Sequence, residues 1–320
     1  MRAMQLIAYD TDLQLSTVDV PEPAAGEVVI HVAACGLNFA DTLMIKGSYQ
    51  EKPRLPATLG LELAGTVSAV GAGVTGFEVG ARVAAYAGGG GLADYAAVPA
   101  KLCVTIPDKM PFTDAAGFLI AYGTSHLALH DRARMQKGER LLVLGASGGV
   151  GLTAVELGHL MGAEVVACAR GAQKLELCKE MGADHLIDSD TDDIRDRVKA
   201  LGGADVVYDP IGGEQFTAAM RACNPGARLL PLGFASGKVA PIPANILLVK
   251  NMSVLGLYIG GYAKLNPKAL TDSFDTLIGW YNEGRIAPHV SNVLPLEDTN
   301  AGLDLLRRRQ ATGKVVIAVN

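Results

Sequence analysis

Paired cysteines are missing from this sequence of 320 residues. Its five cysteines contain no CxxC pair, and an odd, scattered set argues against a disulfide framework. We therefore expect reduced thiols in a reducing compartment, and hence a cytoplasmic location. The five residues are Cys35, Cys103, Cys168, Cys178 and Cys223.

Long uninterrupted apolar runs are missing too. The most apolar long stretch, residues 152–169, is interrupted by Glu156, His159 and Glu164, which a bilayer core would penalise. The first ten residues carry Arg2 but no apolar segment and no small-residue cleavage site. We expect neither a membrane span nor a secretory signal.

The third missing feature is an excess of positive charge. Lysine and arginine together number 28 against 33 acidic residues, giving a net charge of -5 and a pI near 5.7. No basic stripe is available to neutralise phosphates, which argues against nucleic acid as the main partner. With 49% apolar residues, 19% charged residues and no repeat or low-complexity tract, the chain is not disordered. Its length predicts two domains.

The first third of the sequence predicts β-structure. Short β-branched runs alternate with glycine-rich turns, and four consecutive glycines predict a tight or mobile loop over residues 86–94. Helical spacing over 113–131, with Thr113 as N-cap, then marks the end of this β-rich part. The predicted strands are residues 28–34, 65–70, 81–85 and 93–98.

The middle of the chain shows another pattern, in which short β-branched runs alternate with helices. Parallel neighbours need a crossover helix, so this alternation predicts the α/β class with a doubly wound parallel sheet. After residue 261 the alternation stops, and we expect the tail to return to the first domain. The predicted strands are 140–144, 164–169, 206–208 and 229–232, with helices to 161 and over 173–181, 214–223, 267–283 and 298 onward.

Between the first of these strands and its helix stands the sequence GASGGVG. Gly148, Gly149 and Gly151 follow the strand directly and open the helix. Without side chains there, backbone amides can approach a pyrophosphate, whose charge the helix N-terminus also favours. This strand–turn–helix context predicts a dinucleotide site.

The end of the second strand indicates which dinucleotide binds. An acidic residue there would hydrogen-bond the ribose hydroxyls of NAD, but this sequence has Ala169, followed by Arg170 and Lys174. Two cations and no carboxylate suit a 2'-phosphate, and cations at a helix start are otherwise unfavourable. We therefore expect NADPH as the cofactor.

Five segments in order, GLNFAD, GLELAG, GASGGVG, GFASG and GKVVIAV, give the chain a family resemblance. It resembles the zinc-free quinone oxidoreductases, including zeta-crystallin relatives, of the medium-chain dehydrogenase/reductase superfamily. The resemblance implies a GroES-like β-rich catalytic domain, residues 1–118 and 262–320, around a Rossmann domain, residues 119–261. It also implies a homodimer.

Together, the motifs and the resemblance give an expected cofactor-binding set on the strand-end loops and nearby segments. Gly212, Gly233 and Phe234 are expected beside the nicotinamide half, although each is also an ordinary strand-end residue. The full set is Tyr49, Thr124, Ser147, Gly148, Gly149, Val150, Gly151, Arg170, Lys174, Gly212, Gly233, Phe234, Ala235, Ser236, Leu257 and Tyr258.

No metal site is expected. Zinc-dependent members of the superfamily would carry a cysteine where this chain has Asn38 and a histidine where it has Leu61, and neither residue here replaces those ligands. His126 and His130 have metal-like spacing, but without a nearby carboxylate or cysteine we interpret them as packing or surface residues.

The resemblance implies catalytic roles for Asn38 and Tyr49. Without a Lewis acid, alcohol oxidation is disfavoured, whereas a conjugated carbonyl needs only alignment and hydrogen-bond donors for the developing oxyanion. Asn38 can donate through its amide, and Tyr49 through its phenol, which is also a possible proton source. The structural alternatives are a turn-forming asparagine and a half-buried surface tyrosine.

Two residues depart from the bacterial quinone reductase pattern. Leu43 replaces an expected active-site tyrosine and makes the pocket more apolar, and Asp188 replaces a tyrosine or histidine on the adenosine side. We expect an NADPH-dependent reductase of a quinone or other conjugated carbonyl. The alternatives are a 2-enoyl or alkenal reductase, an NADPH-binding sensor, or an RNA-binding zeta-crystallin-like protein.

Overall fold

The computed structural model describes all residues from Met1 to Asn320. Internal contacts divide the chain into two compact units. Unit 1 comprises Met1–Ile120, Phe274–Asn282 and Ala287–Asn320, and unit 2 comprises Ala121–Ser273 and Glu283–Ile286. The sequence-based domain limits at residues 118 and 261 stay a prediction. No helix has the length and apolar character that a bilayer crossing requires.

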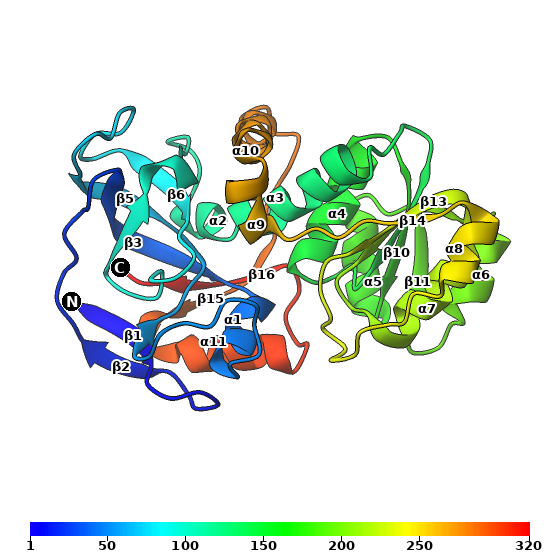
Figure 1. The fold of residues 1–320 in the computed structure, drawn as a ribbon, viewed down its shortest axis with the longest axis horizontal. Coiled ribbons are helices and arrows are strands. Elements are labelled where there is room, and N and C mark those ends of the chain that lie inside the picture. The colour runs from blue at the N-terminus through cyan, green and yellow to red at the C-terminus, as the bar shows by residue number, and fades with distance from the viewer. The chain divides into compact units, whose positions relative to one another are not determined.

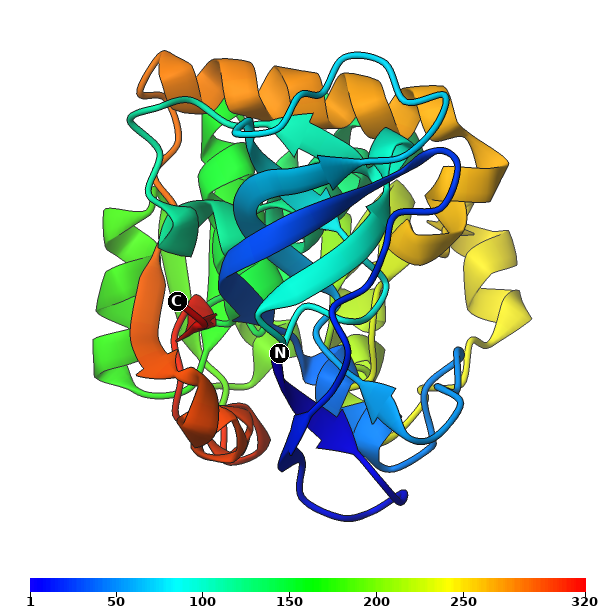
Figure 2. The same cartoon turned by 90° about the vertical axis from the view of Figure 1, so that its left-hand side faces the viewer.

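Unit 1 contains two β-sheets. The smaller has the order β2-β1-β4, and the seven-stranded one has the order β15-β16-β3-β5-β6-β8, with β7 paired to β3. Figure 2 shows the curved strands, with the dark-blue β1–β2 hairpin below them. The strands are β1 (Arg2–Leu6), β2 (Gln14–Thr17), β3 (Glu27–Leu37), β4 (Ala57–Thr58), β5 (Glu62–Val70), β6 (Arg82–Tyr86), β7 (Tyr95–Pro99), β8 (Cys103–Thr105), β15 (Val290–Pro295) and β16 (Lys314–Ala318).

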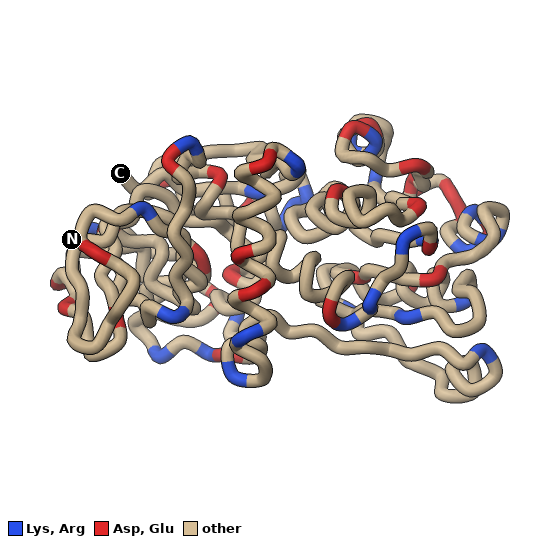
Figure 3. Tube along the Cα trace, turned by 90° about the horizontal axis from the view of Figure 1, so that it is seen from above, with Lys and Arg blue, Asp and Glu red and all other residues tan.

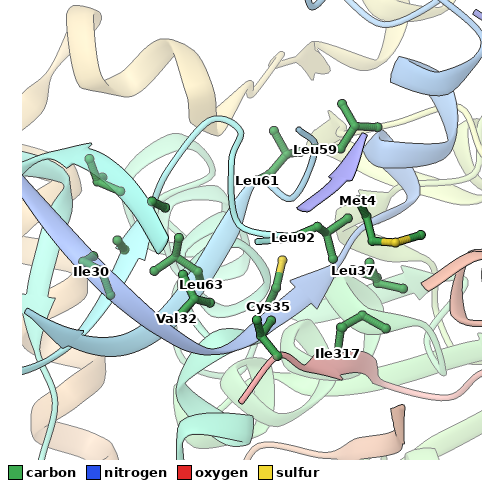
Figure 4. Packing of buried hydrophobic residues seen from close by; sticks show 14 of the residues in the cluster. Met4, Ile30, Val32, Cys35, Leu37, Leu59, Leu61, Leu63, Leu92 and Ile317 are labelled. Atoms are coloured by element: carbon green, nitrogen blue, oxygen red, sulfur yellow. The ribbon is translucent and has the colours of Figure 1, made fainter. Parts of the chain in front are cut away.

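Strand β3 forms the centre of unit 1. It pairs with β5, β7 and β16, and consecutive residues such as Val28, Val29 and Ile30 are buried because both faces are covered. Each such side chain contributes about 1.5–3 kcal/mol by leaving water. Figure 4 shows Cys35 of this strand in the same core cluster. Cys35 is fully buried and packs as a small apolar residue, and this burial raises the pKa of its thiol well above the usual value.

The helix predicted over 113–131 is broken in the structure. Helix α2 (Phe112–Ala116) ends at Gly117, helix α3 (Leu119–His126) starts anew, and a π-helical turn, Leu127–Arg132, continues it. The aliphatic stem of Lys314 packs against Gly117, where a Cβ would lie 3.1 Å from it. Helix α3 and the π-helical turn lie almost entirely in unit 2, which starts at Ala121. Besides α2, the helical segments of unit 1 are α1 (Phe39–Ile45), α11 (Thr299–Arg307) and the 3-10 turns Ala100–Leu102 and Leu296–Asp298.

Unit 2 is built on a six-stranded sheet with the order β11-β10-β9-β12-β13-β14, in which every pairing is parallel. Helices surround this sheet, coloured green to yellow in Figure 1. The order is that of doubly wound dinucleotide folds, so the predicted fold class is confirmed. The strands are β9 (Arg140–Leu144), β10 (Glu164–Ala169), β11 (His185–Asp188), β12 (Ala204–Asp209), β13 (Cys223–Pro231) and β14 (Ser253–Val254).

Helices cross over between these strands. The segment 253–261, which is strand-like in sequence, is a strand only at Ser253–Val254, and Tyr258 is the N-cap of helix α9. The helices are α4 (Gly149–Leu160), α5 (Ala172–Glu180), α6 (Ile194–Ala200), α7 (Gly213–Ala222), α8 (Ala244–Lys250), α9 (Ile259–Leu265) and α10 (Pro267–Asn282), the last with residues in both units.

Candidate cofactor and active sites

The glycines between β9 and α4 have two different roles. A Cβ on Gly151 would lie 2.2 Å from the carbonyl oxygen of Gly145, so the fold itself requires glycine there. A Cβ on Gly148 would meet only that oxygen, at 3.4 Å, and its φ of -79° suits any residue. The fold therefore leaves space over Gly148, at the N-cap of a helix whose first turn contains no acidic residue. Such a helix start attracts an anion.

This difference predicts opposite results for two alanine variants. We expect Gly148→Ala to stay within about 1 kcal/mol of wild-type stability but to bind NADPH about tenfold more weakly or worse, because the Cβ occupies the pyrophosphate space. Gly151→Ala should lose about 2 kcal/mol or more of stability, because its Cβ meets backbone. Chemical denaturation and NADPH titration measure the two effects. Equal NADPH affinity in Gly148→Ala and wild type would contradict the assignment.

A network of buried hydroxyl groups holds the start of helix α4, next to the glycine turn after β9. The Ser125 hydroxyl donates to the carbonyl oxygen of Val150 at 3.0 Å and lies 2.8 Å from both Thr153 Oγ1 and the Tyr208 hydroxyl. Ser125 and Tyr208 are fully buried, and burial raises the pKa of the tyrosine phenol. The network joins α3, the start of α4 and β12, so the turn is held in place by the protein alone.

The loops after β12 and β13 lie against each other. The Ala235 and Ser236 amides donate to the carbonyl oxygens of Pro210 and Ile211 at 3.1 and 3.0 Å. Gly212 has a φ of +72°, and a Cβ there would lie 2.7 Å from the Lys238 carbonyl oxygen. These contacts bring five candidates into one loop cluster, namely Gly212, Gly233, Phe234, Ala235 and Ser236.

The carboxylate of Asp209 holds the first of these loops. It accepts hydrogen bonds from the backbone N–H of Ile211 at 2.8 Å and of Gly212 at 2.9 Å. Burial raises the pKa of Asp209 from 3.8 to about 6, although these amides act in the opposite direction. The raised pKa of about 6 belongs to a carboxylate that holds the predicted nicotinamide loops.

We expect a measurable pH effect from Asp209. Because its pKa is raised on folding, the native state binds the extra proton, and this contribution to stability falls as pH rises from about 4 to about 6. Asp209→Asn removes the contribution but keeps an acceptor oxygen. The stability of the variant relative to wild type should therefore rise by up to about 3 kcal/mol over that interval. Denaturation at several pH values tests this, and a constant difference would contradict it.

At the end of β10, Arg170 follows Ala169 and forms an ion pair. Its Nε lies 3.0 Å from Asp190 Oδ1, and both side chains are about half exposed, at 54% and 52%. Lys174 is partly buried in α5, which has no acidic residue in its first turn. The cations predicted to bind a 2'-phosphate thus follow β10 at the same sheet edge as the turn after β9.

The remaining cofactor candidates of unit 2 differ in exposure. Thr124, Ser147 and Leu257 are buried, whereas Gly149 and Tyr258 are partly buried. Phe234 is 41% exposed. Because the sheet is parallel, the loops after β9, β10, β12 and β13 meet at one edge, where ligands of open α/β folds bind.

In unit 1, Asn38 belongs to a buried charged network. Its Nδ2 donates to Glu62 Oε1 at 3.0 Å and to the Gly36 carbonyl oxygen at 3.2 Å. Its Oδ1 accepts from Lys314 Nζ at 2.8 Å. Lys314 also donates to Glu62 Oε1 at 2.8 Å and to the carbonyl oxygen of Leu37 at 2.7 Å. All three ammonium protons thus have acceptors, which a buried charge requires.

The register of the sheet explains how these residues meet. Glu62 on β5 pairs with Gly36 on β3, and Lys314 on β16 directly precedes Val315, which pairs with Leu37. A Cβ on Gly36 would lie 3.0 Å from Glu62 Oε1 and 2.3 Å from the Ala116 carbonyl oxygen. Glycine at this position therefore leaves room for the side chains of the two outer strands to meet beside β3.

Sequence reasoning missed Glu62 and Lys314. They are 252 residues apart, yet the exposed fractions of their side chains are only 1% and 9%. The available signal was one charged residue in each of two apolar segments, GLELAG and GKVVIAV. A lone charge in a buried strand requires a partner.

Tyr49 and Leu43, the other residues of unit 1 singled out in the sequence, lie in or near helix α1, which also contains Asp41. Asp41 accepts a hydrogen bond from the Asn38 backbone N–H at 2.8 Å, so it is a structural partner, and burial raises its pKa to about 6. Tyr49 and Leu43 are partly buried, and Tyr49 packs against the core of unit 1.

The two histidines with metal-like spacing belong to unit 2. His126 is buried, with its Nδ1 2.8 Å from Ser273 Oγ, and its ring stacks on exposed His130. They are packing and surface residues, as expected. The structure contains no group of three or more His, Cys, Asp or Glu side chains placed to hold a metal ion.

Comparisons with known proteins agree with this geometry. The family model of the alcohol dehydrogenase GroES-like domain matches residues 24–108, and that of the zinc-binding dehydrogenase matches residues 149–276. A quinone oxidoreductase-like protein 2 homologue from Nematostella vectensis is 39% identical over 91% of this chain and 81% of its own length.

Two similar solved structures are quinone oxidoreductases described in complex with NADPH. The Escherichia coli protein has a TM-score of 0.94 at 26% identity, and the Thermus thermophilus protein has 0.89 at 32%; each comparison covers 100% of both chains. With Asn38 and Leu61 at the positions of zinc ligands, the chain belongs to the zinc-free quinone oxidoreductase branch of the medium-chain dehydrogenase/reductase superfamily.

Proposed function

We propose that this protein is an NADPH-dependent reductase that acts on a quinone or another conjugated carbonyl compound and needs no metal ion. The observation that carries the proposal is the space over Gly148, which the fold does not fill, at the same sheet edge as Arg170. The NADPH complexes of the E. coli and T. thermophilus relatives support the choice of cofactor.

Residues of unit 2 would hold the cofactor. The backbone of Gly148, Gly149 and Gly151 suits the pyrophosphate, and Arg170 with Lys174 suits the 2'-phosphate. Thr124, Ser147, Val150, Leu257 and Tyr258, together with the loop cluster after β12 and β13, complete the proposed set. When bound, NADPH supplies a hydride from its nicotinamide ring.

Residues of unit 1 would activate the acceptor. We assign Asn38 and Tyr49 as donors to the carbonyl oxygen, with Tyr49 also proposed in the cofactor set and as a proton source. The two Asn38 donor bonds differ in length, 3.0 Å to Glu62 and 3.2 Å to Gly36. The longer one, to a neutral carbonyl, is the one that an acceptor oxygen would replace. Asn38 and Leu61 cannot replace the cysteine and histidine that bind zinc in related enzymes. Without such a metal ion to activate an alcohol, reduction is the favoured direction.

A panel of acceptors tests the proposal. We expect purified wild-type protein to oxidise NADPH with simple quinones, and Tyr49→Phe to turn over about tenfold more slowly or worse if the phenol supplies the proton. Turnover of enones or enoyl thioesters alone would instead assign a 2-enoyl or alkenal reductase. Tight NADPH binding without oxidation by any acceptor would assign a sensor.

The remaining alternative, RNA binding, has little support from charge. Figure 3 shows lysine and arginine interspersed with aspartate and glutamate along the chain, and the net charge is -5. We further propose a homodimer in the cytoplasm. The location is supported by five free cysteines, all buried.

A further inference from the structure

The arginine that we assign to the 2'-phosphate already has an anion beside it. Arg170 follows β10, Asp190 follows the neighbouring strand β11, and Arg170 Nε lies 3.0 Å from Asp190 Oδ1. The end of β10 has Ala169 where NAD-binding proteins carry an acidic residue. Asp190, which follows the neighbouring strand β11, places a carboxylate close to this position. This contact has no counterpart in the linear motif.

The position of Asp190 is fixed by a second carboxylate. Asp188 Oδ1 accepts hydrogen bonds from the Asp190 backbone N–H at 3.0 Å and the Gly171 backbone N–H at 3.2 Å. Asp188 is anchored in turn, because its own N–H donates to Asp192 Oδ2 at 2.9 Å. One side chain therefore ties the loop that carries Arg170 to the loop that carries Asp190.

The ion pair itself is not needed for the fold. Both side chains are about half exposed, and exposed pairs of this kind contribute little to stability. A carboxylate at this place does affect a bound phosphate, because it shares the guanidinium with it and repels its charge. Both effects weaken with added salt, since the groups are exposed.

We propose that Asp190 is a specificity-determining residue that competes with the 2'-phosphate of NADPH for Arg170. It lowers the preference for NADPH over NADH that Arg170 and Lys174 would otherwise give. The inference rests on the proposed function, because it assumes that NADPH binds at this sheet edge. Asp188 is the residue that holds the competitor in place.

Titration of Asp190→Asn with NADPH and with NADH tests the inference by binding alone. We expect NADPH affinity to rise about three- to tenfold at low salt, with NADH affinity changed less than about twofold, because only NADPH carries the phosphate. The gain should shrink in about 0.5 M salt. It should also be smaller in an Arg170→Ala background, where no guanidinium remains to compete for.

Glu180→Gln is the matched control. It removes one exposed carboxylate from the far end of α5, about 13 Å along the helix, and should leave both affinities unchanged. If wild-type protein binds NADPH but Asp190→Asn shows the same NADPH-to-NADH ratio, Asp190 does not set the preference. If the wild type binds neither nucleotide, the proposed function falls, and this inference falls with it.

Discussion

Replacing Lys314 with methionine should cost about 3–5 kcal/mol of stability, the usual result of leaving a buried charge without its partner. Methionine keeps most of the apolar stem that packs on Gly117 but removes the ammonium from three acceptors, Leu37, Asn38 and Glu62. The Glu62 carboxylate, 1% exposed, then has no cation. Chemical denaturation of the variant measures the loss, and a change below about 1 kcal/mol would contradict this account.

The double variant Lys314→Met/Glu62→Gln separates stability from catalysis. Glutamine at position 62 removes the unpaired charge but keeps an oxygen that can accept a hydrogen bond from the Ile120 N–H. In the wild type this N–H donates to Glu62 at 2.9 Å. We expect the double variant to regain at least half of the lost stability. Turnover should be lower than in wild type in both Lys314→Met and the double variant, because Asn38 Oδ1 has lost the donor that orients its amide. Recovery of both would show that Lys314 is purely structural rather than a positioning residue.

The second large effect concerns the cofactor. Arg170→Ala combined with Lys174→Ala should weaken NADPH binding about 10- to 100-fold, the loss of one or two charge-assisted hydrogen bonds. NADH affinity should change less than about threefold, because its ribose carries no phosphate. Fluorescence titration with both nucleotides measures the effect.

A control for this double variant is Lys199→Ala with Arg221→Ala. It also removes two positive charges, but from exposed positions of unit 2 outside the proposed site. It should not alter the ratio of NADPH affinity to NADH affinity. An equal loss for both nucleotides in Arg170→Ala/Lys174→Ala would refute the assignment of the 2'-phosphate site.

Local patterns predicted most of what is local in this structure. The β9–α4 turn has its glycines next to one another in sequence, and the alternation of strands and helices in unit 2 reflects neighbouring segments. Several short strands, including β1, β4, β8 and β11, were not predicted, and among them β2 is an exposed edge strand without apolar alternation, so no period of two was available. The break at Gly117 was missed although a glycine inside a helix weakens it, and the packing of the Lys314 stem on Gly117 could not be predicted because Lys314 comes from the far end of the chain.

The same distinction applies to the candidate sites. Asn38 was identified by its place in a motif, but its hydrogen-bond partners could not be, since Lys314 lies 276 residues away. Likewise, the sequence showed that Ala169 stands in place of an acidic residue. It could not show that Asp190 lies beside Arg170, because that contact depends on the pairing of β10 with β11. Charge placement across strands depends on register, which the linear pattern does not contain.

We propose that the protein transfers a hydride from NADPH to a conjugated acceptor without a metal ion. The most direct measurement is a single-turnover reaction of chelator-treated protein with a quinone, using NADPH and NADPH deuterated at the transferred position. We predict that the chelator-treated protein oxidises one NADPH for each quinone that is reduced. The reaction should be slower with the deuterated cofactor than with unlabelled NADPH. Loss of turnover on chelation with recovery on adding zinc, or no oxidation with any conjugated acceptor, would contradict it.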